Sequence, residues 1–373
     1  MASVARRSDG QWRARYRDAD GREHSKHFPR KLDAERWAAT QRVSVDSGQH
    51  VNPKAGQQTF VTYAEAWRAM QDHRPGTAAL YERVLRLHAY PVLGSRPLAS
   101  VRHSDARAFV TGLSRTLAPN TARQVHAIVR TIFRSAVHDR LIIESPFAQI
   151  KLPSVERTRL APLTVEQVRQ VAAAAPDRLR ALVLTAAGTG LRSGELLGLT
   201  VDSIDFLRRE LHVRQQLVYV PGTAPFIGEP KTPESKRTVP LPRFVVDALA
   251  EHLASFPAAH VGLVFQADKG GPILRTTLNG RWVRTLRRAG LPEDTHMHHL
   301  RHHYASVLID GGESVKVVQE RLGHSSAEET LRTYAHLMPQ SDQRTRSVVE
   351  LAWSENQQSS PQDRADSVRT AGR

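Results

Sequence analysis

The chain contains no cysteine among its 373 residues, which excludes disulfide bonds, thiolate zinc sites and thiol nucleophiles together. No stretch approaches the roughly 18 consecutive apolar residues that a transmembrane helix needs. The first residues carry several arginines and lack the hydrophobic segment of a secretion signal. These absences predict a cytoplasmic protein with no membrane partner.

Acidic residues are scarce relative to basic ones: 37 Asp and Glu stand against 53 Lys and Arg, which gives a net charge of +16 and a pI near 10.7. Such a surplus is typical of proteins that bind a polyanion, with nucleic acid a more frequent partner than a membrane. A high-GC genome that encodes arginine in place of lysine would explain the composition without any partner. Composition alone therefore indicates nucleic-acid binding without establishing it.

The length exceeds one ordinary hydrophobic core, and a hydrophobic content of 40% suffices for globular packing. The residue pattern predicts a multidomain chain with a small α+β module at 1–57, an all-helical unit at 58–155 and a mainly α-helical α+β domain at 156–355. Residues 52–58 and 151–159 are predicted linkers, and the polar segment 356–373 is a predicted disordered tail.

Residues 11–17 alternate between the two faces of a predicted strand, because successive side chains on a strand point to opposite sides. One face carries Trp12, Ala14 and Tyr16, and the other carries Arg13, Arg15 and Arg17. We expect a turn at Asp20-Gly21, a partner strand at 22–28 and a helix at 31–42. An open arginine face suits a DNA groove, although an ordinary solvated strand face explains the pattern equally well.

The all-helical unit is predicted to contain helices at 77–90, 104–113 and 120–141. The last has the strongest pattern, because its apolar residues recur at the spacing of one buried helical face. Arg123 and Arg130 lie among its polar positions and are candidate DNA contacts.

The last domain shows two capping-box patterns, Thr164 with Gln167 and Ser326 with Glu329, which predict helix starts. The second pattern opens a helix that carries Tyr334. Residues 211–220 and 237–241 are predicted strands around a loop rich in glycine and proline.

Four segments of this domain carry residues suited to phosphate chemistry. Cleaving a phosphodiester requires a nucleophile, an acid for the leaving oxygen and positive charge on the non-bridging oxygens, which metal ions commonly supply. The sequence shows no carboxylate cluster for a metal, whereas arginine offers a permanent charge and a planar fork that matches phosphate. The segments are TGLRSGELLGL with Arg192 and Glu195, KTPESKRTVPL with Lys231 and Lys236, HHLRH with His298 and Arg301, and LGHS with His324, followed ten residues later by Tyr334.

In this order the segments resemble the motifs of the tyrosine recombinase family, also called phage integrases, and the resemblance extends along the whole chain. It implies that Arg192 and Arg301 clamp the scissile phosphate of DNA while Tyr334 attacks it. The implied product is a 3′-phosphotyrosyl bond that conserves the bond energy, so the reaction needs neither a metal, ATP nor another cofactor.

The resemblance also implies roles for the remaining residues. His298 and His324 would hydrogen-bond the phosphate or assist proton transfer, and Glu195 would orient Arg192. Lys231 would be the general acid that protonates the leaving 5′ oxygen, with Lys236 as the alternative.

The same resemblance implies an arm-type DNA-binding domain at the N-terminus, a core-binding domain of the SAM-like helical type, and a catalytic domain. The implied partners are double-stranded DNA attachment sites, three further copies of the chain in a tetramer on DNA, an excisionase and a host DNA-bending protein. An apolar group formed by Val348, Val349, Leu351 and Trp353 would dock on a neighbouring protomer or pack within its own domain.

Several alternatives stay open at the level of sequence. His299 stands where the family often has an acid, and it could take the role given to His298, although the spacing from Arg301 favours His298. His303 stands where threonine is frequent, and the crowded imidazoles at 296–299 raise the alternative of a metal site. A type IB topoisomerase-like enzyme and a non-catalytic DNA-binding regulator are the competing functions.

Overall fold

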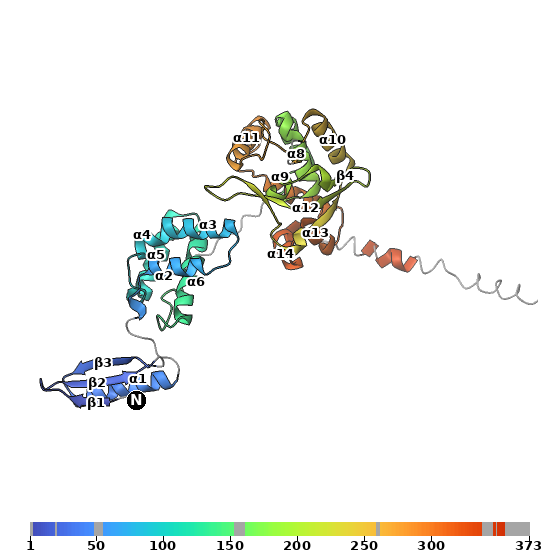
Figure 1. Cartoon of the computed structure of the whole chain (residues 1–373). Coiled ribbons are helices and arrows are strands. Elements are labelled where there is room, and N and C mark those ends of the chain that lie inside the picture. Colours follow the sequence, from blue (N-terminus) through green and yellow to red (C-terminus); the bar gives the residue numbers. More distant parts are fainter. Residues whose placement is uncertain are drawn as a thin grey trace, which may run out of the picture. The chain divides into compact units, whose positions relative to one another are not determined.

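The computed structural model describes residues 3–18, 21–47, 55–152, 161–258, 262–337, 346–347 and 349–354. The chain divides near residue 160 into two compact units, and Figure 1 colours the elements along the sequence. The predicted turn residue Asp20, residues 52–54 and 153–159 of the predicted linkers, Val348 and the predicted tail at 356–373 lie outside the described residues. The predicted multidomain, mainly helical fold class is confirmed.

The N-terminal module is a three-stranded antiparallel sheet beside one helix, formed by β1 (Ser3–Arg6), β2 (Trp12–Arg17), β3 (Glu23–Phe28) and α1 (Lys31–Asp46). The predicted packed face of β2 is confirmed, because Ala14 is buried against Ala34 and Ala38 of α1 and the Tyr16 ring meets Trp37 edge-on at 5.3 Å. The sequence did not predict β1, which adds a third strand at the other side of β2.

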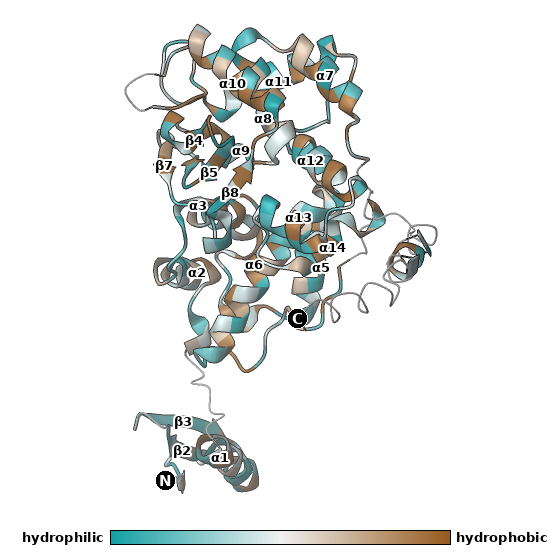
Figure 2. Ribbon diagram, turned by 90° about the vertical axis from the view of Figure 1, so that its right-hand side faces the viewer, coloured by the Kyte–Doolittle hydropathy of each residue, from teal (hydrophilic) through white to brown (hydrophobic). Residues whose placement is uncertain are grey.

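The next part is all helical, as predicted, and comprises α2 (Phe60–Ala69), α3 (Pro75–Val84), α4 (Tyr90–Leu93), α5 (His103–Thr116) and α6 (Pro119–His138), with 3₁₀ turns at Ala55–Gln57 and Leu98–Ser100. The Phe60 and Phe133 rings stack at 5.2 Å in its core, and the Phe147 ring lies 5.0 Å from Phe133. Brown and teal residues alternate along the helices in Figure 2, as amphipathic packing requires.

The predicted helix at 77–90 is a helical path with an irregular centre. A π-helical segment, Leu85–Ala89, lies between α3 and α4. Pro91 explains the irregularity, because proline lacks the N–H that would donate to the Leu87 carbonyl four residues earlier.

The remaining part combines helices with two small antiparallel sheets. Its helices are α7 (Val165–Ala174), α8 (Asp177–Thr189), α9 (Ser193–Leu197), α10 (Arg243–Ser255), α11 (Arg275–Arg288), α12 (His298–Asp310), α13 (Val315–Leu322) and α14 (Ala327–Tyr334), with 3₁₀ turns at Val201–Ser203, Pro233–Ser235 and Ala335–Leu337. One sheet is formed by β4 (Ile204–Asp205), β5 (Glu210–Val213) and β8 (Arg237–Pro240), and the other by β6 (Gln216–Val218) and β7 (Phe226–Gly228). The predicted strand at 211–220 is therefore divided between two sheets.

Both predicted helix starts in this part are confirmed. Thr164 accepts a hydrogen bond from the Gln167 backbone at 3.1 Å, and the Gln167 side chain accepts one from the Thr164 backbone at 2.9 Å. Ser326 caps α14 by accepting from the Glu329 backbone at 3.3 Å. These local bonds fix where α7 and α14 begin.

The helix that carries Tyr334 has a small hydrophobic core of its own. A large cluster around Leu182 and Phe265 fills the body of this part. A separate cluster joins Tyr334 of α14 to Tyr304 of α12 and Leu322 of α13. Helices α12, α13 and α14 are thus packed together as one group. Arg301 lies in α12, α13 ends at Leu322, and Tyr334 lies in α14.

Among the residues that the structure describes, no helix is long and apolar enough to cross a lipid bilayer.

The described members of the predicted apolar group lie on the surface and not in a core. The exposed fractions of Val349, Leu351 and Trp353 are 50%, 59% and 72%.

The buried face of α6 can be tested by substitutions that change the stability of this unit. Ile132 is fully buried, whereas Ile143 in the same unit is 81% exposed. We expect Ile132→Ala to destabilise this unit by about 2–5 kcal/mol through lost burial and a cavity, and Ile143→Ala to change stability by less than about 0.5 kcal/mol. Hydrogen–deuterium exchange of the α6 amides measures both, and equal exchange in the two variants would contradict the assignment of this core.

Candidate active site

Arg192 directly precedes α9 and is held there by Glu195, one turn further on. The Glu195 carboxylate accepts hydrogen bonds from the Arg192 backbone N–H at 3.0 Å and from its Nη1 at 2.9 Å. Gly190 before it has a φ of +63°, and a Cβ there would lie 2.4 Å from the Tyr304 ring. The glycine-rich turn therefore brings Arg192 to the start of α9 in a single fixed orientation.

Three guanidinium groups converge on the C-terminal end of α13. Arg237 Nε donates to the Arg321 carbonyl at 2.8 Å, Arg301 Nη2 to the Leu322 carbonyl at 2.7 Å, and Arg192 Nη2 to the Gly323 carbonyl at 2.8 Å. Carbonyls at this position have no partner within the helix and lie at the negative end of its dipole, which favours cations. Gly323 has a φ of +64°, and a Cβ there would meet Arg237 Nη1 at 2.9 Å. The LGHS segment thus needs its glycine.

Arg237 was not predicted from the sequence as a site residue, yet it shares Glu195 with Arg192. Its Nη2 lies 3.0 Å from the carboxylate, and the two side chains are 6% and 2% exposed. Burial by itself raises the pKa of Glu195, but the charges and hydrogen bonds of Arg237 and Arg192 outweigh burial and lower that pKa below its usual value. Glu195 is therefore a buried carboxylate between two cations.

Arg301 lies in α12 with 2% of its surface exposed. Besides the bond to Leu322, its Nη1 donates to the Gly190 carbonyl at 2.7 Å. Burial and the charge of Arg192 lower the pKa of Arg301 to about 9, which still leaves the guanidinium charged at neutral pH. Two of its five N–H donors are used on these carbonyls, so three remain for a phosphate.

Tyr334 is the last residue of α14 and is 2% exposed. Burial raises the pKa of Tyr334 to about 12, while the charges of Arg301 and Arg192 act in the opposite direction. The tyrosine therefore lies within electrostatic range of both arginines. Residues distant in the sequence are brought together as a phosphate site requires.

His324 stacks on Tyr334, with ring centroids 6.3 Å apart and planes 11° from parallel. Its Nδ1 is 2.8 Å from the Thr330 hydroxyl, a partner on α14 that the sequence did not point to. Burial, Arg301 and Arg192 lower the pKa of His324 to about 3, so this imidazole is neutral near pH 7.

His298 and His299 occupy different positions at the start of α12. The His299 ring faces the backbone of His296, with Nδ1 at 2.9 Å from its amide nitrogen and 3.0 Å from its carbonyl oxygen. His298 is open to solvent on one side, yet the protein crowded around it, Arg301 and Arg192 lower its pKa to about 4. The charges of the two arginines therefore act on His298.

The His303 side chain is buried, and its Nδ1 lies 2.7 Å from the carbonyl oxygen of Leu163. This contact holds the segment before α7 and is not part of the arginine and tyrosine cluster. Within the described ranges, His, Asp and Glu side chains nowhere form a group of three that could hold a metal ion.

A loop between β7 and β8 carries both candidate lysines. Lys231 is exposed and forms no ion pair with any described residue, whereas Lys236 Nζ lies 3.3 Å from Glu229. Ser235, in the same loop, is buried and accepts a hydrogen bond from Arg192 Nη1 at 3.3 Å. The serine and Arg237 of the KT-x-x-S-x-R pattern thus connect the lysine loop to Glu195 and Arg192.

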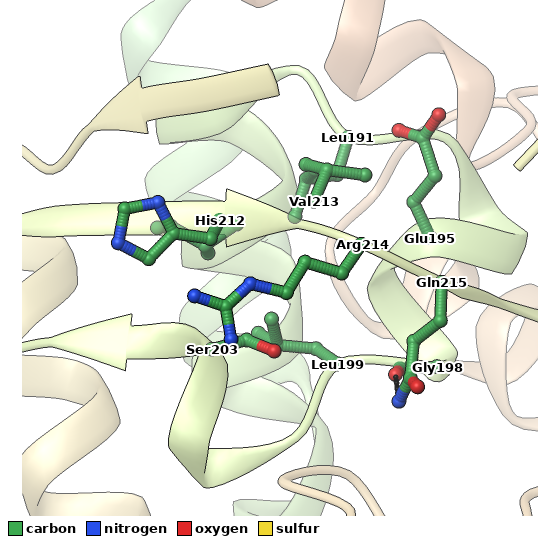
Figure 3. Close-up of a pocket in the computed structure, with 10 residues that line it drawn as sticks. Leu191, Glu195, Gly198, Leu199, Ser203, His212, Val213, Arg214 and Gln215 are labelled. Atoms are coloured by element: carbon green, nitrogen blue, oxygen red, sulfur yellow. Dashed lines mark hydrogen bonds between the residues drawn. The ribbon is translucent and has the colours of Figure 1, made fainter. Parts of the chain in front are cut away.

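A small pocket lies on the other side of α9, between that helix and β5. Figure 3 shows its lining, with His212 and Arg214 across the pocket from the Glu195 carboxylate. The pocket has no room for a ligand, and the arginine, histidine and tyrosine side chains described above do not line it. The candidate site is therefore the cluster around the end of α13.

The predicted DNA-contacting arginines belong to the other parts of the chain. Arg17 is exposed on β2, and Arg15 and Arg17 approach Glu23 at 3.5 Å and 3.9 Å. Arg123 and Arg130 are both exposed on α6, where the intervening apolar residues face the core. Arg13 is half-buried, and its Nε has no hydrogen-bond partner among the described residues.

Two family models and several known proteins match most of this chain. Residues 161–341 match the phage integrase family, and residues 60–152 match the phage integrase central domain. The integrase of Mycobacterium phage D29 is 26% identical over 88% of this chain and 90% of its own length. A "Tyrosine recombinase XerC-like" protein of Caldanaerobacter subterraneus is 33% identical over 62% of this chain and 65% of its own length.

Solved structures show the same fold. The Tn1549 transposon integrase bound to transposon right end DNA is 26% identical, with a TM-score of 0.69 over 79% of this chain and 100% of that one. A lambda integrase tetramer bound to a Holliday junction has a TM-score of 0.58, 18% identity and coverage of 88% and 94%. The chain belongs to the phage integrase family of tyrosine recombinases. It is a site-specific recombinase, an enzyme that cuts and rejoins DNA strands.

Glu195 gives a prediction for stability and its pH dependence. Glu195→Gln leaves the buried guanidinium of Arg237 and the half-buried one of Arg192 without their counter-charge, which costs about 3–5 kcal/mol. The folded pKa of Glu195 is below its ordinary value of 4.5, so its stabilisation is fully present above pH 4.5 and is lost as the pH falls through the folded pKa. Urea unfolding at several pH values should show this acid loss in the parent and a smaller one in the variant.

The matched control is Glu229→Gln, because Glu229 also pairs with a cation but is 80% exposed. We expect little change in its unfolding free energy. An equal cost in the two variants would contradict the structural role assigned to Glu195.

Proposed function

We propose that the chain recombines DNA attachment sites of a phage or another mobile element with Tyr334 as its nucleophile. The observation that carries this proposal is that Tyr334 packs in one cluster with Leu322, whose carbonyl accepts a hydrogen bond from Arg301. Arg192 donates to the next carbonyl, that of Gly323, and the charges of both arginines act on the Tyr334 phenol. Such a phenol and two guanidinium groups around one point suit attack on a phosphodiester without a metal.

The arginines would hold the non-bridging oxygens of the scissile phosphate. Arg192 uses three of its five N–H donors on Glu195, Ser235 and Gly323, which leaves two for the phosphate. Three guanidinium charges (Arg192, Arg237 and Arg301) less one carboxylate leave two positive charges, with the neighbouring histidines neutral. This matches the two negative charges of a pentacoordinate phosphorus, and loss of one such donor costs about 10²–10³ in rate.

Two successive transesterifications follow from this arrangement. The Tyr334 oxygen attacks phosphorus as its proton passes to a neutral imidazole, His298 or His324, and the bond to the 5′ oxygen breaks as Lys231 donates its proton. A 5′ hydroxyl of the partner strand then gives its proton to Lys231 and attacks the phosphorus of the 3′-phosphotyrosyl bond, and the departing phenol oxygen takes its proton back from the imidazole. His298 and His324, both neutral, would donate hydrogen bonds to the phosphate. Because Tyr334 is 2% exposed, residues around α14 must open locally before the phosphate reaches it.

Exchange between two duplexes cuts four strands, and each cut uses one tyrosine, so we propose a tetramer on DNA. The lambda integrase tetramer on a Holliday junction supports this by analogy of fold, and the exposed Val349, Leu351 and Trp353 offer an apolar surface for a neighbouring copy.

We further propose residues 1–57 as the arm-type DNA-binding domain, 58–155 as the core-binding domain and 156–355 as the catalytic domain. The arginines proposed to contact DNA are Arg13, Arg15, Arg17, Arg123 and Arg130. We also propose an excisionase and a host DNA-bending protein as partners of this chain, and the cytoplasm as its location.

The nucleophile is tested by covalent capture. Incubating the protein with genomic DNA of its source and mapping the nucleotide joined to protein identifies the attachment site. On a nicked duplex of that site, the cleaved fragment diffuses away, and we expect a protein–DNA adduct that Tyr334→Phe abolishes. Tyr304→Phe is the control, because it removes a hydroxyl from the same small core.

The products separate the competing functions. Holliday junctions or exchanged strands indicate a recombinase, and relaxed supercoils without exchange indicate a type IB topoisomerase. An adduct that persists in Tyr334→Phe would overturn the assignment of the nucleophile. Specific binding with no adduct would favour a non-catalytic regulator.

The choice between the two lysines is tested with a sulfur substitution in the DNA. A 5′-bridging phosphorothiolate releases a thiol, which leaves without the help of an acid. We expect Lys231→Ala to lose cleavage of ordinary DNA and to recover it on the sulfur substrate. Lys236→Ala should retain cleavage on both, and the reverse pattern would assign the acid to Lys236.

A further inference from the structure

His302 occupies a place in the site that no role yet accounts for. It lies in α12, one residue after Arg301 and one helical turn after His298, and it is half-buried. Its ring is edge-on to Tyr334, with centroids 5.4 Å apart and planes at 63°. It also meets the His298 ring edge-on, with centroids 4.7 Å apart and planes at 86°. His302 thus contacts both His298 and the tyrosine.

The Tyr334 ring therefore lies between two imidazoles from different elements. His324, from the turn after α13, stacks nearly parallel to the phenol, and His302, from α12, contacts it edge-on. A tyrosine has two side-chain torsions, and Tyr334 stands at the end of an eight-residue helix. One parallel and one perpendicular neighbour restrict both torsions, because each contact limits a different rotation of the ring.

The charges around His302 keep it neutral. Burial first, and then the nearby His298, His299, Arg301 and His336, lower the pKa of His302 to about 4. A neutral ring fills the space beside the phenol without adding a fourth cation to the site. It can therefore act through its shape over the whole range near neutral pH.

We propose that His302 is a positioning residue that holds the Tyr334 phenol in line for attack on the phosphate. The proposal rests on the proposed function, since it requires Tyr334 to be the nucleophile. A reacting oxygen must lie within about 3–3.5 Å of its target, and a misplacement of about 1 Å costs about 10² in rate. Removing the His302 ring leaves one side of the phenol without a neighbour and allows such a displacement.

Two substitutions separate shape from proton chemistry. His302→Ala removes the ring, and His302→Phe keeps an aromatic ring of similar width that cannot carry a proton. We expect His302→Ala to lower the single-turnover rate of adduct formation on the nicked attachment-site duplex by about 10², with unchanged affinity for DNA. His302→Phe should restore most of the rate. Ser306→Ala, one turn further along α12, is the control and should cleave at the parent rate.

A second measurement needs no DNA. A fluorotyrosine incorporated at position 334 gives a ¹⁹F resonance that depends on its neighbouring rings. We expect His302→Ala to shift or broaden this resonance and His302→Phe to leave it narrow, with unfolding temperatures measured alongside to identify any variant that fails to fold.

Each outcome decides the proposal. Equal rates in the parent and His302→Ala, or an unmoved resonance, would overturn it. Loss of cleavage in both variants together with a changed pH profile would also overturn it and assign a proton-transfer role instead. If the parent protein itself forms no adduct at Tyr334, the proposed function fails first, whereas a parent adduct with an unaffected His302→Ala defeats only the inference about His302.

Discussion

The end of α13 is the constraint on which the rest of the site depends. Its last carbonyl groups, on Arg321, Leu322 and Gly323, each accept a hydrogen bond from a different arginine. Like charges brought this close repel one another, and they stay together because the helix dipole and the single buried carboxylate of Glu195 compensate them. The arginines come from the start of α9, from β8 and from α12, so one helix end organises elements that are far apart in the sequence.

This arrangement keeps an excess of positive charge inside the folded protein. Burial first, and then the charge of Arg301 and other neighbours, lower the pKa values of His324 and His302 to about 3 and about 4. In the proposed mechanism, a phosphate that enters the site would offset this excess charge, because Arg192 and Arg301 would donate hydrogen bonds to it. Burial also raises the pKa of the Tyr334 phenol in the same group of residues.

Local signals in the sequence predicted much of the fold, and long-range contacts account for most of what was missed. Thr164 and Ser326 marked helix starts, and alternation along 12–17 gave the packed face of β2, because these features depend on neighbours in the sequence. The third strand, β1, and the division of 211–220 between two sheets depend on partners far away. The roles assigned to Arg192, Arg301 and Tyr334 came from family resemblance. Arg237 was missed because its link to Glu195 spans 42 residues.

The hydrogen bond from Arg192 to Ser235 has a consequence for the timing of the two steps. Rejoining is the reverse of cutting, so the group that gives a proton to the departing oxygen must take one back from the incoming hydroxyl. In the proposed mechanism, this bond would keep the lysine loop beside the same atoms while the covalent intermediate lasts. The lysine that gave the proton would then take one back from whichever strand arrives, and the chemistry itself would impose no direction on the exchange.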